Sequence, residues 1–378
     1  MISAEVVWDL QSFDALAAEW DALDSLGVSD PCTSLAWTSA LLTSHVEDSD
    51  TVFAVVLRSQ GRVVAIVPAL MRRERVLGSF DIAALDLLCD LTPSHSDLLR
   101  DEDRPDIVPA FFDAIATLPC RWDVLRIRRL LEASTVSLQV AEYLPRSGLG
   151  FRIRREQPAF MLELAGSYEE FLASRSAKFR NYLRRKTRQL ESLGRLRIAR
   201  AGNDLSVADA FEQLLAIEVR SWKHGHGTAI SAVSRQREFY RLLCEGAHRS
   251  RRLHLMLMYL GDVPIAFNLG IVIADRYSYL KTSFDERLRQ ASPATVLRAR
   301  LVESLIADGI QTLDFPGQPY QWERQWAETL RWRRSVVVFN RTPRGMLYRL
   351  LTQVRGLARS RESGTVSYAD PRELGGAP

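Results

Sequence analysis

The sequence predicts an α/β protein with mixed sheets, arranged as two copies of one unit of strands and helices. Apolar runs of strand length alternate with segments of helical spacing, which is typical of packed strand and helix layers. A hairpin signal occurs at Gly61-Arg-Val-Val-Ala65 and again, 200 residues later, at Gly261-Asp-Val-Pro-Ile265. A helical pattern and a short strand follow both. Because 378 residues are too many for one ordinary core, we expect two domains.

The first copy is predicted to occupy residues 1–150. It opens with a strand at 6–8, a helix with apolar positions Phe13, Leu16, Trp20 and Leu23, and a second helix that begins at Pro31. Strands at 51–57 and 63–70 form the hairpin, and a helix at 107–118 and a strand at 122–127 complete the unit. Residues 128–160 are interpreted as the connection between the copies.

A polar loop of the first copy, residues 90–97, brings a histidine and a carboxylate close together. His95 and Asp97 lie two residues apart in it. Such a loop either supplies groups that bind an acceptor at a domain interface or lies in solvent on the surface. The residues alone leave both alternatives open.

The second copy is predicted to occupy residues 151–343. Helices are expected at 168–193 and 211–222, the latter with Glu218 and Trp222 on one face because they lie four residues apart. The central segment then predicts strands at 253–260, 263–273 and 277–284, a helix at 293–308, and strands at 310–315 and 332–340. Residues 344–378 are predicted to form a basic amphipathic helix and a flexible tail.

The helix expected at 293–308 has an informative entrance. Ser292 is predicted to cap it with its hydroxyl, and Pro293 fits the first helical position, where no backbone N–H is needed. Alanines on either side keep the entrance narrow. A helix N-terminus of this kind either binds an anion such as a pyrophosphate or is only a well-capped helix.

Charge divides the chain into two unequal parts. Residues 1–150 carry 12 basic and 23 acidic residues, a net charge of −11, whereas the remainder carries 38 basic and 23 acidic residues, a net charge of +15. Seven of the basic residues fall between 175 and 188, where they either clamp phosphates or form a solvated helix face. The second half is therefore expected to face an anionic ligand, an acidic carrier protein or a membrane surface.

Several classes of protein are not indicated. The four cysteines lie far apart, so neither a disulfide framework nor a metal site is predicted. No nucleophile elbow, phosphate loop with Gly-Lys-Ser/Thr or His-Glu-x-x-His is present, and no reader motif accompanies the basic patch, so nucleic-acid binding is not favoured. The N-terminus lacks a basic segment ahead of an apolar stretch, so a cytoplasmic protein is expected.

Four features of residues 253–326 carry a family resemblance: the hairpin at 261–266, Ser292-Pro293, Asp314 with Gly317, and Trp322-x-x-x-Trp326. In this order the segment resembles the acyltransferase core of the GNAT superfamily. It looks most like a bacterial double-domain subgroup, found beside cellulose and envelope polysaccharide genes and related to Fem-type peptidyltransferases. Two residues depart from that pattern: Ala294 stands where the relatives carry glycine, and Glu323 where they carry lysine.

The resemblance implies tandem GNAT-like domains, the first degenerate, and a site for an acyl-CoA or acyl carrier protein thioester. Residues Ala291, Ser292, Pro293, Ala294 and Thr295 would take the donor's phosphates, and the splayed strands around 269–273 and 310–315 its pantetheine. Glu218 and Asp97 are candidates for removing the proton from the acceptor, and Tyr320 for donating a proton toward the sulfur. His95, Trp222, Lys281, Asp285 and Asp314 are candidates for shaping the site and contacting the substrate.

The function implied is N-acyl transfer to a primary amine: an amino sugar, an amino acid or a lipid precursor such as a sphingoid-type base. A Fem-like transferase that uses aminoacyl-tRNA, and a binding module of the same fold without catalysis, are the alternatives. The basic helix after residue 344 either packs on the domain or lies on the inner membrane.

Overall fold

The structure is a computed structural model. It describes residues 2–8, 13, 15–26, 30–76, 78, 80–91, 94–101, 104–317, 319–327 and 329–362, with side chains to residue 354 in the last helix. Parts of three predicted segments lie outside these ranges. They are Thr92 and Pro93 of the polar loop, Gln318 after the strand expected at 310–315, and the tail from residue 363.

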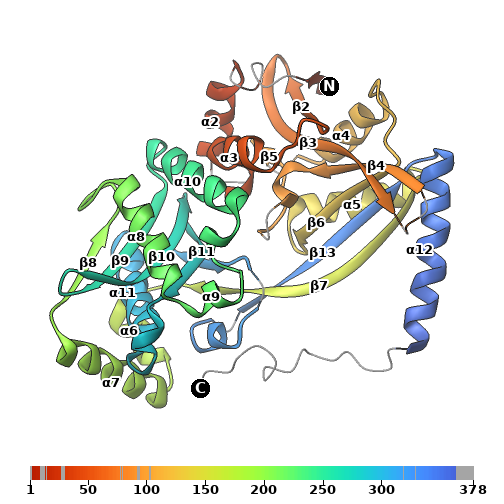
Figure 1. Ribbon diagram of the computed structural model, residues 1–378. Coiled ribbons are helices and arrows are strands. Elements are labelled where there is room, and N and C mark those ends of the chain that lie inside the picture. The colour runs from red at the N-terminus through yellow and green to blue at the C-terminus, as the bar shows by residue number, and fades with distance from the viewer. Residues whose placement is uncertain are drawn as a thin grey trace.

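One mixed sheet runs through the described part of the molecule, so the predicted α/β class is confirmed (Figure 1). Its 13 strands include a path in the order β1-β2-β3-β4-β6-β13-β7-β12-β11-β10-β9-β8, with β5 paired to β3. The strands of the first half are β1 (Ile2–Val7), β2 (Thr51–Ser59), β3 (Arg62–Val76), β4 (Phe80–Leu87), β5 (Leu99–Arg100) and β6 (Val124–Leu131). Those of the second are β8 (Leu196–Arg200), β9 (Leu253–Leu260), β10 (Val263–Ile273), β11 (Arg276–Phe284) and β12 (Thr312–Phe315).

The two halves repeat one topology, as the paired hairpins predicted. In the first half β1 to β4 are antiparallel neighbours, and β6 then pairs in parallel with β4. In the second half β8 to β11 are antiparallel neighbours, and β12 pairs in parallel with β11. A parallel pair requires a crossover, and a helix supplies it in both halves: α4 (Ile107–Ala116) and α11 (Pro293–Ala307).

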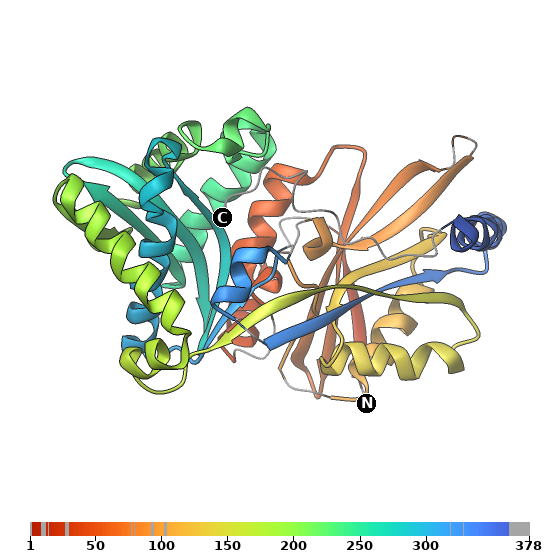
Figure 2. The same cartoon turned by 90° about the horizontal axis from the view of Figure 1, so that it is seen from below.

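The halves exchange strands at their junction. β7 (Gly150–Glu163) follows the first half in the chain, but it pairs with β12 of the second. β13 (Thr329–Phe339) comes from the far end of the chain and pairs with β6 of the first half. The two long strands also pair with each other and run side by side across the molecule (Figures 1 and 2). The division at residue 150 stays a prediction.

Helices cover both faces of this sheet (Figure 2). Those of the first half are α2 (Ala17–Ser25), α3 (Leu35–His45), α4 and α5 (Thr135–Tyr143), with single 3-10 turns at η1 (Pro31–Thr33), η2 (Leu88–Leu91) and η3 (Leu144–Arg146). Those of the second are α6 (Tyr168–Ser174), α7 (Ala177–Leu193), α8 (Val207–Val219), α9 (Trp222–Gly225), α10 (Ser234–Arg249) and α11, with η4 (Ile230–Ala232), η5 (Glu286–Ala291) and η6 (Gln321–Gln325). The last helix is α12 (Pro343–Glu362).

The interface between the halves is a packed core. Helix α3 of the first half lies against α10 of the second, where the rings of Trp37 and Phe239 meet edge to face at 5.4 Å. A Cβ on Gly246 of α10 would lie 2.9 Å from the Cβ of Ala36, so only glycine permits this close approach. A second core lies beneath α6, α7 and α11 on the other face of the second half.

Residues 128–160, interpreted as the connection between the copies, contain regular elements that the sequence did not predict. This stretch contains the end of β6, helix α5 and most of β7. Ser134 caps α5 by accepting the N–H of Ser137, and β7 is paired on both of its edges. β4 was not predicted either.

Two predicted helices were also wrong in extent. The helix expected at 168–193 divides into α6 and α7, because Arg175 and Ser176 are extended and Ser176 caps the second helix. The helix expected to reach Trp222 ends at Val219, and Ser221 begins α9. Glu218 and Trp222 therefore do not share a helix face.

Candidate functional site

A β-bulge shapes strand β11. Leu269 of β10 pairs with Lys281, but the next residue, Gly270, pairs with Tyr279, so Leu280 is an extra residue in β11. Because a bulge places two successive side chains on one face, Lys281 follows Leu280 toward helices α8 and α10. Leu280 packs there against the larger core, and the Lys281 ammonium lies 5.3 Å from the centre of the Tyr240 ring.

The parallel strands β11 and β12 part soon after they begin. They pair only from Arg276 with Thr312 to Ser278 with Asp314, after which β11 continues to Phe284 and β12 ends at Phe315. Within the described sheet, the backbone of β11 beyond Ser278 has no paired strand on this side. The splayed pair is thus β11 and β12. The predicted stretch 269–273 belongs to β10, which pairs with β9 and β11.

The predicted phosphate-binding residues run from Ala291, the last residue of η5, to Thr295 in the first turn of α11; this stretch is the turn 291–295. The rest of η5 lies between β11 and this turn, so the strand does not lead directly into the helix as expected. The predicted cap is also wrong: Ser292 has a left-handed backbone (φ 51°), and its hydroxyl makes no capping hydrogen bond. It lies instead 2.7 Å from the Tyr182 hydroxyl of α7. The Lys186 ammonium, one turn further along α7, donates to the Gln290 carbonyl.

Glu218 lies in a buried polar cluster beneath α8. One carboxylate oxygen accepts the Ile230 N–H at 2.5 Å, and the other lies 3.5 Å from the Lys223 ammonium. Lys223 also donates to the Thr282 carbonyl at 2.5 Å. Burial lowers the pKa of Lys223 to about 8, although the charge of Glu218 opposes that shift. Burial also lowers the pKa of Lys281. Both Glu218 oxygens are therefore engaged.

Tyr320 and Glu323 lie on the opposite face of the sheet, near α11. The half-exposed Tyr320 ring stacks on Trp322 at 6.2 Å, and burial raises the pKa of its hydroxyl. Glu323 is buried and accepts the Tyr320 N–H at 3.1 Å. Burial raises the pKa of Glu323 to about 8. The guanidinium of Arg298 lies 3.8 Å from the centre of the Trp322 ring, a cation–π contact.

A cavity of about 230 Å³ lies where the halves meet. Its charged and polar lining comes from the first half and from β11 and β13 of the second: Asp30, His95, Ser96, Asp97, Arg100, Ser134, Thr135, Arg276 and Arg331. Asp97 is paired with Arg100 at 2.8 Å, and burial raises the pKa of its carboxyl group.

His95 joins the halves at this cavity. Its Nε2 lies 3.0 Å from the Asp314 Oδ2 of β12, and an Arg331 Nη1 lies 3.0 Å from the same oxygen. Burial by itself would raise the pKa of Asp314, but His95 and Arg331 outweigh it and hold that pKa below its usual value. A hydrogen bond also holds the backbone of His95, because the Cys32 thiol donates to the His95 backbone carbonyl at 2.7 Å.

Asp30, His95 and Asp314 are also the residues best placed to hold a cation. One potential ligand atom from each lies within 4.8 Å of the others, and all three residues are buried. Among the described residues, Asp30 Oδ2, His95 Nδ1 and Asp314 Oδ1 have no hydrogen-bond partner. Arg331 already neutralises the Asp314 carboxylate, which weakens the case for a metal.

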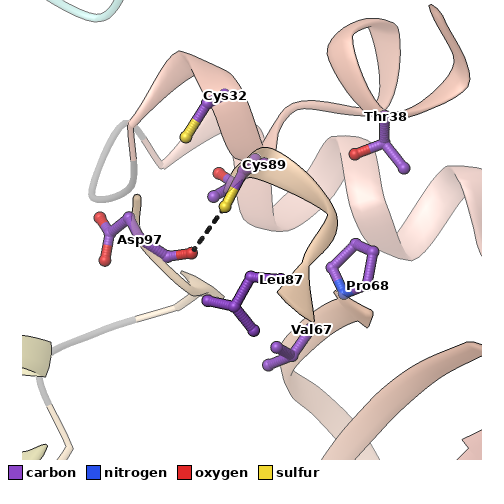
Figure 3. Close-up of a pocket in the computed structure, with 8 residues that line it drawn as sticks. Cys32, Thr38, Val67, Pro68, Leu87, Cys89 and Asp97 are labelled. Carbon is purple, nitrogen blue, oxygen red and sulfur yellow. Dashed lines mark hydrogen bonds between the residues drawn. The ribbon is translucent and has the colours of Figure 1, made fainter. Parts of the chain in front are cut away.

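A second, much smaller cavity lies beside Asp97 (Figure 3). Its volume is about 10 Å³, which is room for at most one water molecule. Asp97 contacts Cys89 there through its backbone carbonyl, and its carboxylate points away (Figure 3). This space holds no substrate.

The predicted site residues thus gather in three places. The turn 291–295 lies with Tyr182, Glu218 lies with Lys281, and His95 lies with Asp97 and Asp314. Three others are apart: Tyr320 stacks on Trp322, Trp222 is 43% exposed against His226, and Asp285 is paired with Arg220 and Arg287. Sequence reasoning missed Asp30, Tyr182, Arg276 and Arg331, because no local pattern marks them.

Residues 177–324 match the protein family described as "Acetyltransferase (GNAT) domain". Among solved structures, FemX is similar over 87% of this chain and 98% of its own, with 10% identity and a TM-score of 0.62. The C-terminal domain of a putative lysylphosphatidylglycerol synthetase from Agrobacterium fabrum is similar over 89% and 94%, with 12% identity and a TM-score of 0.53. No curated protein matches the sequence significantly.

The family match over residues 177–324 and the mixed sheet together support a GNAT-type acyltransferase. The matched segment begins with α7 and ends within η6, so it includes the diverging strands, the turn before α11 and the Glu218 cluster. The structures named above share the fold with this chain, at identities of 10% and 12%.

Proposed function

We propose that this protein is an N-acyltransferase that moves an acyl group from an acyl-CoA or acyl carrier protein thioester to a primary amine. The observation that carries the proposal is the opening between β11 and β12 beside the turn 291–295. An extended pantetheine arm can pair with the free backbone of β11, as a peptide does with a sheet edge. Its phosphates then meet the N-terminus of α11, where backbone N–H groups and the helix dipole favour an anion.

The basic helix α7 supports the same placement of the donor. Tyr182 and Lys186 contact the turn before α11, which brings a hydroxyl and an ammonium to the phosphates. Acyl transfer also requires a proton for the departing sulfur, and Tyr320, on the α11 side, is the candidate donor of that proton. Glu218 is the candidate base by resemblance, although its contacts favour a role in holding Lys223 and Ile230.

The acceptor belongs to envelope, polysaccharide or lipid biosynthesis in this proposal, as in the cellulose-biosynthesis-like subgroup. An acidic carrier protein would suit the net charge of +15 beyond residue 150. Helix α12 stands at the edge of the molecule (Figure 1) and exposes Met346, Leu347, Leu350 and Val354. With its arginines, this face supports peripheral contact of a cytoplasmic enzyme with the inner membrane. Among the described residues, no helix is long and apolar enough to span a bilayer.

A Fem-like reaction that uses aminoacyl-tRNA is the second candidate. Several arginines and lysines of α7 face solvent, among them Lys178, Arg184 and Arg188, and could follow a phosphate backbone. This candidate predicts RNA binding that weakens steeply with salt. A binding module without turnover is the third, motivated by Ala294 and Glu323. It predicts weak thioester binding or none.

Native mass spectrometry tests the proposal. The protein is mixed with acetyl-CoA, a long-chain acyl-CoA, or the same long acyl chain on a carrier protein. We expect a one-to-one complex with one donor and about a tenfold loss of affinity in Lys186→Glu, because a charge-assisted contact is lost and repulsion replaces it. Lys178→Glu, the same charge change two turns earlier in α7, is the matched control. Absence of any donor complex would overturn the proposal.

A further inference from the structure

We propose that the cavity between the halves is the acceptor site, that it takes a small amine carrying its own anionic group, and that His95 accepts the proton of that amine. The inference rests on the proposed acyl transfer, and it adds the class of acceptor and the base. Its grounds are the charges that line the cavity, the pairing of His95, and the position of the cavity beside the diverging strands.

Most charges that line the cavity are already paired. Asp97 binds Arg100, and Asp314 binds Arg331. Two groups of opposite sign are left. Asp30 is buried, and its Oδ2 has no hydrogen-bond partner among the described residues. The structure gives Arg276 no ion pair within the same residues. The Asp30 Oδ1 accepts the Cys32 N–H, so Oδ2 is the carboxylate oxygen that is left. This oxygen and a guanidinium without an ion pair complement a zwitterion, whose ammonium binds the former and whose anionic group binds the latter.

The pairing of His95 leaves one ring nitrogen available. Asp314 is an ionised carboxylate beside Arg331, so it can only accept hydrogen bonds and the Nε2 of His95 must be the donor. In neutral His95 the Nδ1 then carries the lone pair, and it has no partner among the described residues. A histidine acts as a general base in this arrangement, in which a carboxylate holds one ring nitrogen and the other ring nitrogen can accept a proton. An ammonium bound to Asp30 would lie beside this ring, since one carboxylate oxygen of Asp30 and one ring nitrogen of His95 lie within 4.8 Å of each other.

The cavity adjoins the proposed thioester opening. Asp314 pairs with Ser278 at the last step before β11 and β12 part, and Arg276 lies two residues earlier in β11. The acceptor and the thioester would thus meet at the point of divergence. The 230 Å³ of the cavity suits a molecule of amino-acid size and not a lipid chain. A lipid acceptor would need most of its length outside.

Every proton and bond in the proposed step has a destination. His95 Nδ1 takes one proton from the ammonium, and the resulting imidazolium is stabilised by Asp314. The free amine attacks the thioester carbon, the carbon–sulfur bond breaks, and the second N–H proton goes to the departing thiolate. The products are an amide and a thiol, and His95 releases its proton to solvent.

The first test uses calorimetric titration of the whole protein with matched probes. One set is the twenty standard amino acids and phosphoethanolamine; the other is the corresponding amines without the carboxylate or phosphate. We expect at least one zwitterion to bind, and its partner without the anion to bind about 10- to 100-fold more weakly, the worth of one charged hydrogen bond. Equal binding of the two sets, or binding of neither, would overturn the proposal. Because donor binding is measured separately, a failure here leaves the acyltransfer proposal standing.

Variants test the individual roles. Arg276→Gln should abolish the preference for the zwitterion, whereas Arg146→Gln, at an exposed arginine elsewhere, should keep it. His95→Gln should bind donor and acceptor but lose at least 100-fold in kcat. An unchanged kcat would remove His95 as the base. If the purified wild-type protein held one divalent ion and the Asp30→Asn variant held none, the cavity would be a metal site and the acceptor proposal would be overturned. The titration of the wild-type protein decides the acceptor class even if a variant does not fold.

Discussion

At the scale of single residues, Glu218 is the clearest case of a predicted catalytic group with a structural alternative. It is fully buried, and both of its carboxylate oxygens are occupied. Removing one member of a buried ion pair leaves the other charge uncompensated, which typically costs about 3–5 kcal/mol. We therefore expect Glu218→Ala to lower the free energy of unfolding by about that amount at pH 7, as measured by urea denaturation.

The partner of Glu218 provides the control. Lys223→Met in the Glu218→Ala background removes the stranded ammonium, so the double variant should recover part of the lost stability. A Glu218→Ala protein that is as stable as the wild type, yet inactive while still binding donor, would instead identify Glu218 as the catalytic base.

Glu323 predicts a pH dependence of stability. Its pKa is about 8 in the folded protein against 4.5 ordinarily, so between these values the folded state binds more protons than the unfolded state. Stability should therefore fall as the pH rises from about 4.5 to 8. Glu323→Gln keeps an acceptor for the Tyr320 N–H but cannot ionise. Relative to the wild type, we expect it to be nearly neutral at pH 5 and more stable at pH 8.5 by roughly 2–4 kcal/mol, since each pKa unit is worth about 1.4 kcal/mol.

Unfolding midpoints at the two pH values measure this difference. Glu303→Gln, at the exposed surface of α11, is the matched control and should give the same difference from the wild type at both. Asp90, whose pKa burial raises to about 7, contributes with the same sign in both proteins and so cancels in the comparison. Equal destabilisation of Glu323→Gln at both pH values would contradict a raised pKa.

At the scale of elements, the bulge in β11 depends on the residue opposite to it. Gly270 has ordinary backbone angles, but a Cβ there would strike the Tyr277 ring and lie 2.6 Å from the Ser278 carbonyl. Gly270→Ala must therefore move β11 at the point where it leaves β12. We expect a loss of about 2–4 kcal/mol in stability, as for overpacked cores, and a larger loss in donor affinity than in Gly225→Ala. Nothing lies within 4 Å of the Cβ position at Gly225, in α9.

Both effects have direct readouts: urea denaturation for stability, and native mass spectrometry for donor binding. The comparison separates the bulge from a general effect of replacing glycine. If Gly270→Ala kept wild-type stability and donor affinity, the bulge would not shape the donor opening.

Elements with local signals were the ones that the sequence predicted well. The hairpin of β9 and β10 was predicted at its observed bounds, because apolar runs flank Gly261-Asp262. β7 was missed because its first half, Gly-Phe-Arg-Ile-Arg-Arg-Glu, is largely exposed and reads as a solvated segment. Ser292 failed as a cap because its left-handed backbone turns the hydroxyl toward Tyr182, a residue 110 positions away.

At the scale of the whole molecule, the candidate site was likewise predictable only where its residues are neighbours in the chain. The turn 291–295 was predictable because it is continuous in the chain. The pair His95 and Asp314 spans 219 positions, and Arg331 joins it from β13. Each residue was visible as a polar group, but only the fold brings them together, and only the exchanged strands carry Arg331 to the first half.

The exchange of β7 and β13 makes the two halves mutually dependent. β13 supplies the neighbour of β6 in one half and of β7 in the other, so a chain that ends at Ala327 leaves two long facing strand edges unpaired. Exposed strand edges promote aggregation, and we expect this truncated protein to be insoluble. A chain that ends at Gly345 loses most of α12 but keeps β13. It should remain folded and lose only about 1–2 kcal/mol, because the main buried contact removed is that of Tyr348 with Phe339.

Calorimetry of the full chain completes this prediction. Since α3 and α10 share one core and the sheet is continuous, unfolding of either half removes strands and apolar contacts from the other. We expect one cooperative transition, with equal calorimetric and van't Hoff enthalpies, for both the full chain and the chain that ends at Gly345. Two resolved transitions would mean that β7 and β13 separate easily. In that case the cavity holding His95 and Asp314 would open when the halves part, and acceptor binding would be lost at the first transition.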